Sequence, residues 1–414
     1  MEINKQTFSS ELARGSLILF VMLGVFNILN YTFQISMARL LGPKDYGILA
    51  VLMSIIYIFG IPNEAIQTIV TKYTSKFNIK KEYGKMKDLM YRSMKKGFLA
   101  ACIIFLLYVP TAYFLSGYLG IDFILILLIG SFIFYVFSVP IIRGIIQGRK
   151  KFTGLGTSLV MEGFVKVSAS VILVLIGWKV YGAVIGLILS GFFAFVLSFP
   201  IIKEVLISKR ERENFHEIYK TNIPILICIS CIVFMYSLDV IIAKRFFSPE
   251  VAGQYAFISM IGKAIIFISL AVSKAMFPIS SEKHESGEKT TKLFKKSLFV
   301  VSALSLCSLL LYLFFPEQIV KILSVGSTQY LGAANILFIV GLSFSFISIA
   351  NVIILYGLSV DRIKKSSFFL IFFVILEVVL LSLFNSSLLE FSISLLIASF
   401  SMLLYSILVI RRRF

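Results

Sequence analysis

The sequence predicts an all-α polytopic membrane protein with twelve transmembrane helices arranged in two six-helix bundles. Of the 414 residues, 58% are hydrophobic and only 15% are charged, whereas a soluble domain carries about 25% charged residues. The chain is a succession of apolar runs, and its mean hydropathy is +0.95. A short motif also recurs at half the chain length. These observations exclude a soluble multidomain enzyme and point to a chain that faces lipid over most of its surface.

The apolar runs set the number of helices. A helix that crosses the hydrocarbon layer needs about 20 apolar residues. Lipid leaves helices as the only choice here, because alternating strand patterns are absent. We expect spans near residues 14–37, 46–70, 97–117, 122–142, 154–177, 181–202, 222–243, 252–276, 296–315, 330–357, 366–384 and 388–410.

Basic residues orient these spans. If the N-terminus is cytoplasmic, 31 of the 40 Lys and Arg fall in the inner segments and 6 in the outer loops. The remaining three, Lys166, Lys263 and Lys274, lie within spans. Cytoplasmic loops of membrane proteins carry such an excess of Lys and Arg. The sequence therefore predicts a multi-pass protein of the cytoplasmic membrane with both termini inside, and this bias accounts for most of the net charge of +19.

An internal repeat divides the chain. Residues 38–51 read ARLLGPKDYGILAV, and residues 244–257 read KRFFSPEVAGQYAF. Arg, Pro, Gly and Ala recur at one offset of 206 residues, in the outer turn after the first helix of each half. We expect an N-terminal bundle over 1–207, a cytoplasmic linker over 208–221 and a C-terminal bundle over 222–414. Because six is even, both halves enter the membrane with the same orientation, related by a pseudo-two-fold axis along the membrane normal.

Catalytic and metal-binding patterns are missing. The sequence contains no P-loop, HExxH or GxSxG, so it gives no support for ATP-driven or hydrolase chemistry. All four cysteines lie inside apolar runs, and both histidines fall in polar loops, which supports neither a zinc site nor a disulfide framework. We expect no enzyme activity, no metal and no cofactor. A secondary transporter built from two helical bundles is the leading class.

The repeated turns carry a resemblance to a known family. ARLLGPKDYGILAVLMSI, preceded by ELARGSLILF, resembles the opening of polysaccharide flippases of the multidrug/oligosaccharidyl-lipid/polysaccharide exporter superfamily. FFSPEVAGQYAFISMIGKA and AVSKAMFPISSEK resemble the same family's second half. The resemblance implies a MATE-like fold, with two bundles around a cavity that opens to one side at a time. It also implies alternating-access movement of an oligosaccharide on a polyprenyl (pyro)phosphate from the inner to the outer leaflet, for surface polysaccharide or glycan biosynthesis.

Polar residues inside the spans are candidates for the wall of such a cavity. Asn27, Asn30 and Gln34 follow one face of the first span, because residues three and four apart are neighbours on a helix. They can serve as interhelical glue or as a sugar-facing wall, and the sequence leaves both readings open. A weaker polar row in the tenth span includes Asn351.

Intramembrane charges are the stronger signal, since each costs about 2.5–3.5 kcal/mol on insertion scales. Glu162 and Lys166 are four residues apart, which favours a neutralising pair within one helix, with a proton- or phosphate-responsive switch as the alternative. Lys263 lies near mid-membrane and is the first candidate for a phosphate or acidic-sugar contact, or else pairs with Asp239. The further candidates for coupling or charge relay are Glu64, Glu162, Asp239 and Glu377. Arg143 and Lys274 lie near inner ends, where long side chains reach the interface.

Two other functions remain open at this point. One is a multidrug or lipid exporter of the same superfamily, although the first span lacks the acidic residue that the multidrug branch often has. The other is a non-transporting scaffold of a glycan-assembly complex. The expected partners are the bilayer, a lipid-linked glycan and possible neighbours such as a glycan polymerase or glycosyltransferases, but no nucleic acid. A coupling ion, either H⁺ or Na⁺, stays unidentified.

Overall fold

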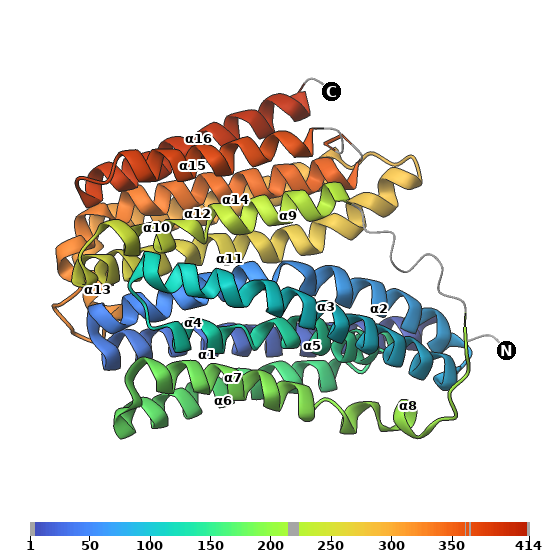
Figure 1. Cartoon of the computed structure of the whole chain (residues 1–414). Coiled ribbons are helices and arrows are strands. Elements are labelled where there is room, and N and C mark those ends of the chain that lie inside the picture. Colours follow the sequence, from blue (N-terminus) through green and yellow to red (C-terminus); the bar gives the residue numbers. More distant parts are fainter. Residues whose placement is uncertain (1–4, 214–222, 361, 364–365, 412–414) are drawn as a thin grey trace. The chain divides into compact units, whose positions relative to one another are not determined.

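The computed structural model describes residues 5–213, 223–360, 362–363 and 366–411, which form helices joined by turns and short loops and contain no strand (Figure 1). The all-α prediction is thus confirmed. The α-helices are α1 Lys5–Phe59, α2 Ile61–Ile79, α3 Tyr83–Leu119, α4 Phe123–Ile129, α5 Phe132–Gly148, α6 Phe152–Leu173, α7 Lys179–Val196, α8 Lys203–Ile207, α9 Ile223–Met235, α10 Leu238–Phe246, α11 Pro249–Glu285, α12 Thr291–Phe314, α13 Pro316–Leu323, α14 Leu337–Ser359, α15 Leu370–Leu383 and α16 Leu388–Arg411.

The helix count is compatible with twelve membrane spans. In the described part of the chain, nine helical stretches are long and apolar enough to cross a membrane, and Ser367–Leu383 is a shorter apolar helix. Two of the nine, Val21–Ile79 and Phe152–Ile207, have 59 and 56 residues, which is more than twice the length that one crossing needs. The first bends at Gly42 (φ 71°) and the second at Gly177 (φ 104°). Glycine tolerates this left-handed backbone because it has no Cβ.

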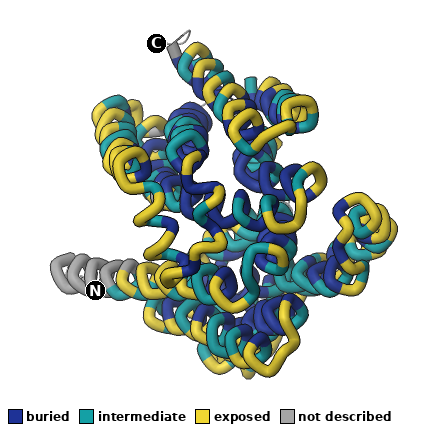
Figure 2. The backbone as a smooth tube through the Cα atoms, turned by 90° about the vertical axis from the view of Figure 1, so that its left-hand side faces the viewer, coloured by how far each residue is buried: buried dark blue, intermediate teal, exposed yellow. Residues whose placement is uncertain are grey.

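Many helices have an apolar face that is exposed in the described part of the chain. Figure 2 shows exposed and buried stretches alternating along single helices. On α3 the side chains of Leu106, Leu107 and Phe114 are 71%, 68% and 74% exposed. Such apolar faces are stable in lipid and costly in water. The protein is therefore a multi-pass membrane protein.

The chain forms two compact units, 1–41 with 62–220 and 42–61 with 221–414. In the first unit, α6 packs on α7 and α3 on α5. In the second unit, α14 is the central helix and packs against α11, α12 and α16. The first unit lacks residues 42–61 of the N-terminal bundle expected over 1–207, and it also includes residues 208–213 of the expected linker. Of the linker expected over 208–221, residues 214–221 lie outside the described part of the chain.

Residues 42–61 join the second unit through an aromatic cluster. The ring of Tyr46 meets Phe257 edge-on at 5.9 Å and Tyr330 at 6.2 Å, measured between ring centroids. All three side chains are fully buried. The two repeated turns also touch here: a Cβ added to Gly253 would lie 1.8 Å from the backbone oxygen of Pro43. Two motifs far apart in the sequence thus pack backbone against backbone.

In the first unit, the segment after α8 is fastened to the start of α3. The buried carboxylate of Asp88 accepts hydrogen bonds from Arg210 Nε at 2.6 Å and from the backbone N–H of Glu213 at 3.2 Å. Lys87 Nζ donates to the backbone oxygens of Leu206 and Ser208 at 2.6 and 2.9 Å. Residues 206–213 therefore follow a defined path along α3.

Candidate functional site

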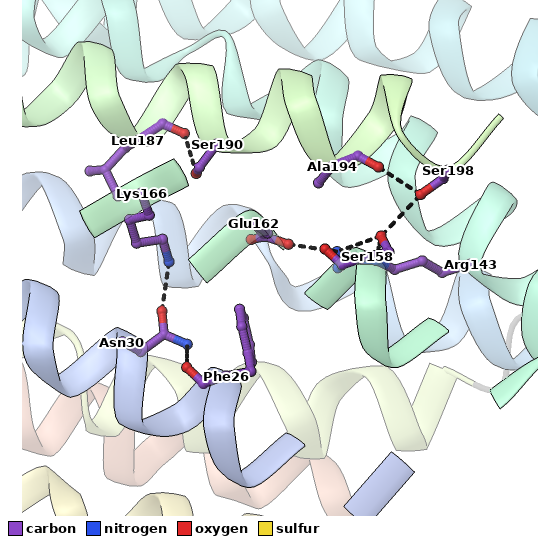
Figure 3. A network of polar contacts seen from close by, with 10 residues as sticks. All are labelled: Phe26, Asn30, Arg143, Ser158, Glu162, Lys166, Leu187, Ser190, Ala194 and Ser198. Carbon is purple, nitrogen blue, oxygen red and sulfur yellow. Dashed lines mark hydrogen bonds and ion pairs between the residues drawn. The ribbon is translucent and has the colours of Figure 1, made fainter. Parts of the chain in front are cut away.

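Lys166 is the central cation of a polar network in the first unit (Figure 3). Its side chain leaves α6 and donates from Nζ to Asn30 Oδ1 on α1 at 2.6 Å. The rings of Phe26 and Phe33 lie 5.8 and 6.0 Å from Nζ, at the distance where an aromatic face attracts a cation. Lys166 is 8% exposed. Among the described residues, no carboxylate lies within ion-pair distance of Lys166. Its ammonium group contacts one amide and two rings, while Glu162 attracts it and Arg143 repels it over longer distances.

Glu162 is bound by Arg143 instead of Lys166. Arg143 Nη2 of α5 lies 2.6 Å from Glu162 Oε2, and Arg143 is 8% exposed. In Figure 3 Glu162 lies beside Arg143, while Lys166 points to Asn30. The expected Glu162–Lys166 pair is thus wrong, and so is the expectation that Arg143 reaches the interface. A guanidinium fork from the neighbouring helix is a better carboxylate partner than a lysine on the same helix.

Two serines extend this ion pair to α7. Arg143 donates to Ser158 Oγ of α6 at 3.3 Å, and Ser158 Oγ is 3.0 Å from Ser198 Oγ. Ser198 in turn donates to the backbone oxygen of Ala194 at 2.6 Å. The network therefore links α5 and α6 to the end of α7, and hydrogen bonds satisfy its buried hydroxyl groups.

The amide row of α1 consists of Asn27, Asn30 and Gln34, and Asn30 is the member that Figure 3 includes in the network. Asn30 is half-buried, and its Nδ2 donates to the Phe26 backbone oxygen at 3.0 Å. Gln34 is half-buried and Asn27 is exposed. Glu64 is exposed near the start of α2 and is not part of the network in Figure 3. Asn30 is therefore a residue of the predicted row that contacts a predicted cation.

The second unit contains a separate buried charge cluster. Lys263 Nζ of α11 lies 3.0 Å from Asp239 Oδ1 of α10, so the expected Asp239–Lys263 pair is present. Asp239 also accepts hydrogen bonds from Tyr255 OH at 3.2 Å and from Ser259 Oγ, both on α11. The carboxylate is 0% exposed and the lysine 6%. Three donors from one helix hold Asp239, which is how a buried carboxylate is stabilised as an anion.

Glu377 of α15 lies close to this pair. It is 0% exposed, and neither carboxyl oxygen has a hydrogen-bond partner among the described residues. Both Asp239 and Lys263 are close enough to act on it electrostatically. Asn351 of α14 is elsewhere in the same unit, where its Nδ2 donates to Ser273 Oγ of α11 at 3.0 Å. Asn351 thus holds two helices together, which agrees with the interhelical reading of polar membrane residues.

Sequence reasoning missed several members of these clusters. Ser158 and Ser198 gave no signal, because single serines are common in apolar helices. Tyr255 and Ser259 could have been found from Lys263, since the three residues are spaced by four along α11 and so share its Asp239-facing side.

The two clusters differ in their balance of basic and acidic side chains. The first holds two cations, Arg143 and Lys166, and one carboxylate. The second holds one cation, Lys263, and two carboxyl groups, Asp239 and Glu377. Lys166 offers a charge-assisted contact to an anion, whereas the second cluster has one acidic group more than its cation can neutralise.

Comparisons with known proteins are consistent with this architecture. Residues 36–334 match the family described as "Polysaccharide biosynthesis protein". An uncharacterized membrane protein of Methanocaldococcus jannaschii is 25% identical over 406 residues, which cover 92% of this chain and 94% of that one. A multidrug resistance MATE family transporter of the MOP superfamily, solved in an inward-facing conformation, is similar with a TM-score of 0.74 and 13% identity over 95% of this chain and 98% of that one. A MOP superfamily transporter from Pyrococcus furiosus is similar with a TM-score of 0.64 and 14% identity, over 97% and 95% of the two chains.

Proposed function

Because the chain belongs to the polysaccharide biosynthesis protein family and has the fold of MATE transporters, we propose that it moves a lipid-linked oligosaccharide across the cytoplasmic membrane. The cargo is an oligosaccharide on a polyprenyl phosphate or pyrophosphate. It passes from the inner to the outer leaflet by alternating access, and both chain termini face the cytoplasm. Glycosyltransferases supply the cargo on the inner side, and a glycan polymerase uses it on the outer side.

The physical task explains why a protein is needed. A glycan carries many hydroxyl groups, and each polar group left unpaired in hydrocarbon costs several kcal/mol. The phosphate link adds negative charge, which is more costly still. A polar path removes both costs for the head group while the polyprenyl tail stays in the bilayer.

The observation that carries this proposal is the state of Lys166. The buried ammonium group of Lys166 contacts an amide and two aromatic rings, and the nearby Glu162 that attracts it is already paired with Arg143. Its charge is therefore incompletely neutralised. A phosphate oxygen is a strong acceptor for such a donor, and the contact is worth about 1.5–3 kcal/mol. The half-buried Asn30 beside it can contact sugar hydroxyls. The site therefore suits an anionic polar head group.

The same charge argues against the multidrug alternative. The first unit's network has two cations and one carboxylate, so a cationic drug would meet net repulsion there. The scaffold alternative gives no role to an incompletely neutralised lysine, whose burial costs stability without benefit to a passive partner.

The test is a flipping assay with the purified chain in lipid vesicles. The probe is a polyprenyl-pyrophosphate oligosaccharide with a fluorescent group on the glycan, and an impermeant quencher reports its leaflet. Lys166→Gln should slow flipping by about 10- to 100-fold, because one charge-assisted contact is lost, while Lys166→Arg should keep part of the rate.

The matched control is Lys95→Gln, which removes an exposed lysine of the same unit and should leave the rate unchanged. The proposal is wrong if vesicles with the wild-type chain flip the glycolipid no faster than empty vesicles. Transport of a cationic dye by that chain, without glycolipid flipping, would favour the multidrug alternative.

A further inference from the structure

Residues 208–213, which we call the clasp segment, have no regular secondary structure and lie against the N-terminal end of α3. Fixing such a segment in one path costs conformational entropy, which its contacts must offset. The backbone N–H of Glu211 donates to the Gly84 oxygen at 3.2 Å. The backbone N–H of Glu213 donates to the Asp88 carboxylate at 3.2 Å. The far end of the clasp segment is therefore bound to α3 through its own backbone.

Asp88 is the buried centre of this attachment. Its carboxylate is 0% exposed and lies 2.6 Å from Arg210 Nε and 3.0 Å from Arg92 Nε. The guanidinium carbon of Arg210 is also 4.1 Å from the centroid of the Tyr91 ring, which is within the range of a cation–π contact. A buried carboxylate depends on such donors, because its charge is otherwise uncompensated. Arg210 thus ties the clasp segment to α3.

Gly84 lets the clasp segment approach α3 closely. A Cβ added to Gly84 would lie 2.4 Å from the Lys209 backbone oxygen and 2.8 Å from Glu211 Cγ. A methyl group at this position would push the segment away, because a backbone oxygen cannot move aside like the end of a flexible side chain. The close approach at Gly84 and the ion pair of Arg210 are separate contacts, so each can be removed without the other.

The clasp segment shortens the connection that leads to the second unit. α8 ends at Ile207 and α9 begins at Ile223, so fifteen residues connect them, and nine of these, 214–222, follow the clasp segment. Fully extended, nine residues span about 30 Å and fifteen residues about 50 Å. With residues 208–213 bound to α3, the connection loses about 20 Å of its greatest reach.

We propose that the clasp segment sets the greatest separation that the two units can reach on the cytoplasmic side. This rests on the orientation and the alternating access proposed above, which make residues 208–222 a cytoplasmic connection between moving units. The bound segment keeps the connection short, and its release lets the inner side open further. The contacts of the clasp do not include Lys166, so they can be removed without altering the proposed cargo site.

Hydrogen exchange measured by mass spectrometry on the purified full chain tests whether the clasp holds. Arg210→Gln removes the ion pair, and Gly84→Ala removes the close approach. Each should speed the amide exchange of Glu211 and Glu213 by about 10- to 100-fold, because the backbone would leave α3. Arg212→Gln, which changes an exposed arginine of the same segment, should leave the exchange unchanged. Unchanged exchange in both clasp variants would overturn the proposal.

Distances between two spin labels then test the consequence for the units. In a background without the native cysteines, labels at the exposed positions Thr153 and Lys289 report the separation of the units on the cytoplasmic side. Both clasp variants should add longer distances to the distribution, and Arg212→Gln should not. An insertion of six Gly and Ser residues directly after Glu213, as many as the clasp segment contains, lengthens the connection with the clasp intact. It should add the same longer distances.

The insertion separates the reach of the connection from any effect of the clasp on the stability of the first unit. If the insertion adds longer distances and the clasp variants do not, the proposal is wrong. It is equally wrong if neither the insertion nor the variants change the distances. Both measurements use the chain without glycolipid. Absence of glycolipid flipping, together with longer distances in the clasp variants, would refute the cargo proposal and leave the clasp standing.

Discussion

Two buried lysines differ in what neutralises them. In direct contact, Lys166 has an amide and two aromatic rings, whereas Lys263 has the carboxylate of Asp239. Removal of one partner from a buried ion pair leaves the other charge uncompensated. The two lysines should therefore respond differently to the same neutral substitution.

Lys263→Met should destabilise the protein by about 3–5 kcal/mol, because Asp239 would lose its cation inside the helical core. Lys166→Met should cost less, since it leaves no buried carboxylate behind. Thermal unfolding in detergent measures both. Asp239→Asn in the Lys263→Met background should restore part of the stability by removing the stranded charge.

The exposed Lys292 on α12 gives the control, and Lys292→Met should unfold at the wild-type temperature. If Lys263→Met were as stable as wild type, Asp239 would not depend on the ion pair. A double variant less stable than Lys263→Met would argue against the pair as the cause.

For single residues, the sequence predicted which side chains inside the helices are charged better than it predicted which residues they contact. The Asp239–Lys263 pair was predictable because consecutive helices joined by a short turn pack side by side and place the two residues at similar depths. The partner of Glu162 was not, because the spacing of Glu162 and Lys166 shows only that they can meet. Arg143 on the neighbouring helix binds Glu162 in place of Lys166. The spacing of residues along one helix cannot show that a residue of another helix is the better partner.

Between elements, the contact of the two repeated turns is the most restrictive feature. Gly47 and Gly253 occupy equivalent positions of the repeat, and a Cβ added to Gly47 would lie 3.0 Å from the Cα of Gly253. Without side chains, α11 and the start of the second span can approach this closely, as small residues permit in membrane helices.

Gly253→Ala should destabilise the second unit, because the new methyl group would overlap the Pro43 backbone, which cannot move aside like a flexible side chain. We expect a cost of at least the ~1–3 kcal/mol typical of overpacking. A lower unfolding temperature in detergent is the readout. Gly117→Ala on α3 is the matched control, since nothing lies within 4 Å of its added Cβ, and it should be neutral or slightly stabilising. Equal stability of both variants would contradict the tight contact.

Helix positions were largely predictable, because an apolar run of membrane length has one stable conformation in lipid. Helix continuity was not. α1 runs from Lys5 to Phe59 across the predicted boundary between the first two spans, with the bend at Gly42 as its only interruption. Hydropathy marks where a chain is apolar and does not show whether a turn between two spans stays helical.

For the whole molecule, the orientation predicted from Lys and Arg can be tested by cysteine labelling. In a background that lacks the four native cysteines, single cysteines at Lys44, Ser248 and Ser386 should react with an impermeant reagent from outside. Cysteines at Lys85, Ser208 and Lys289 should react only after the membrane is permeabilised. External labelling of this second set would reverse the orientation.

The division into units was the least predictable property at this scale. The chain midpoint suggests two consecutive bundles, yet residues 42–61 belong to the second unit. A repeat shows which segments are equivalent, but it does not show which packing surfaces they choose. Here the ring of Tyr46 attaches residues 42–61 to the second unit, because it is buried against Phe257 and Tyr330.

The contact between equivalent glycines also bears on how such a chain diversifies. A dimer of identical half-length chains would make this kind of contact at its two-fold axis, and each substitution would then appear on both sides at once. Every buried charge would be duplicated too. In a single chain, the copies accumulate substitutions independently. That independence permits an excess cation at Lys166 in one half and an excess acid at Glu377 in the other. A dimer of two identical chains could not carry this difference in charge.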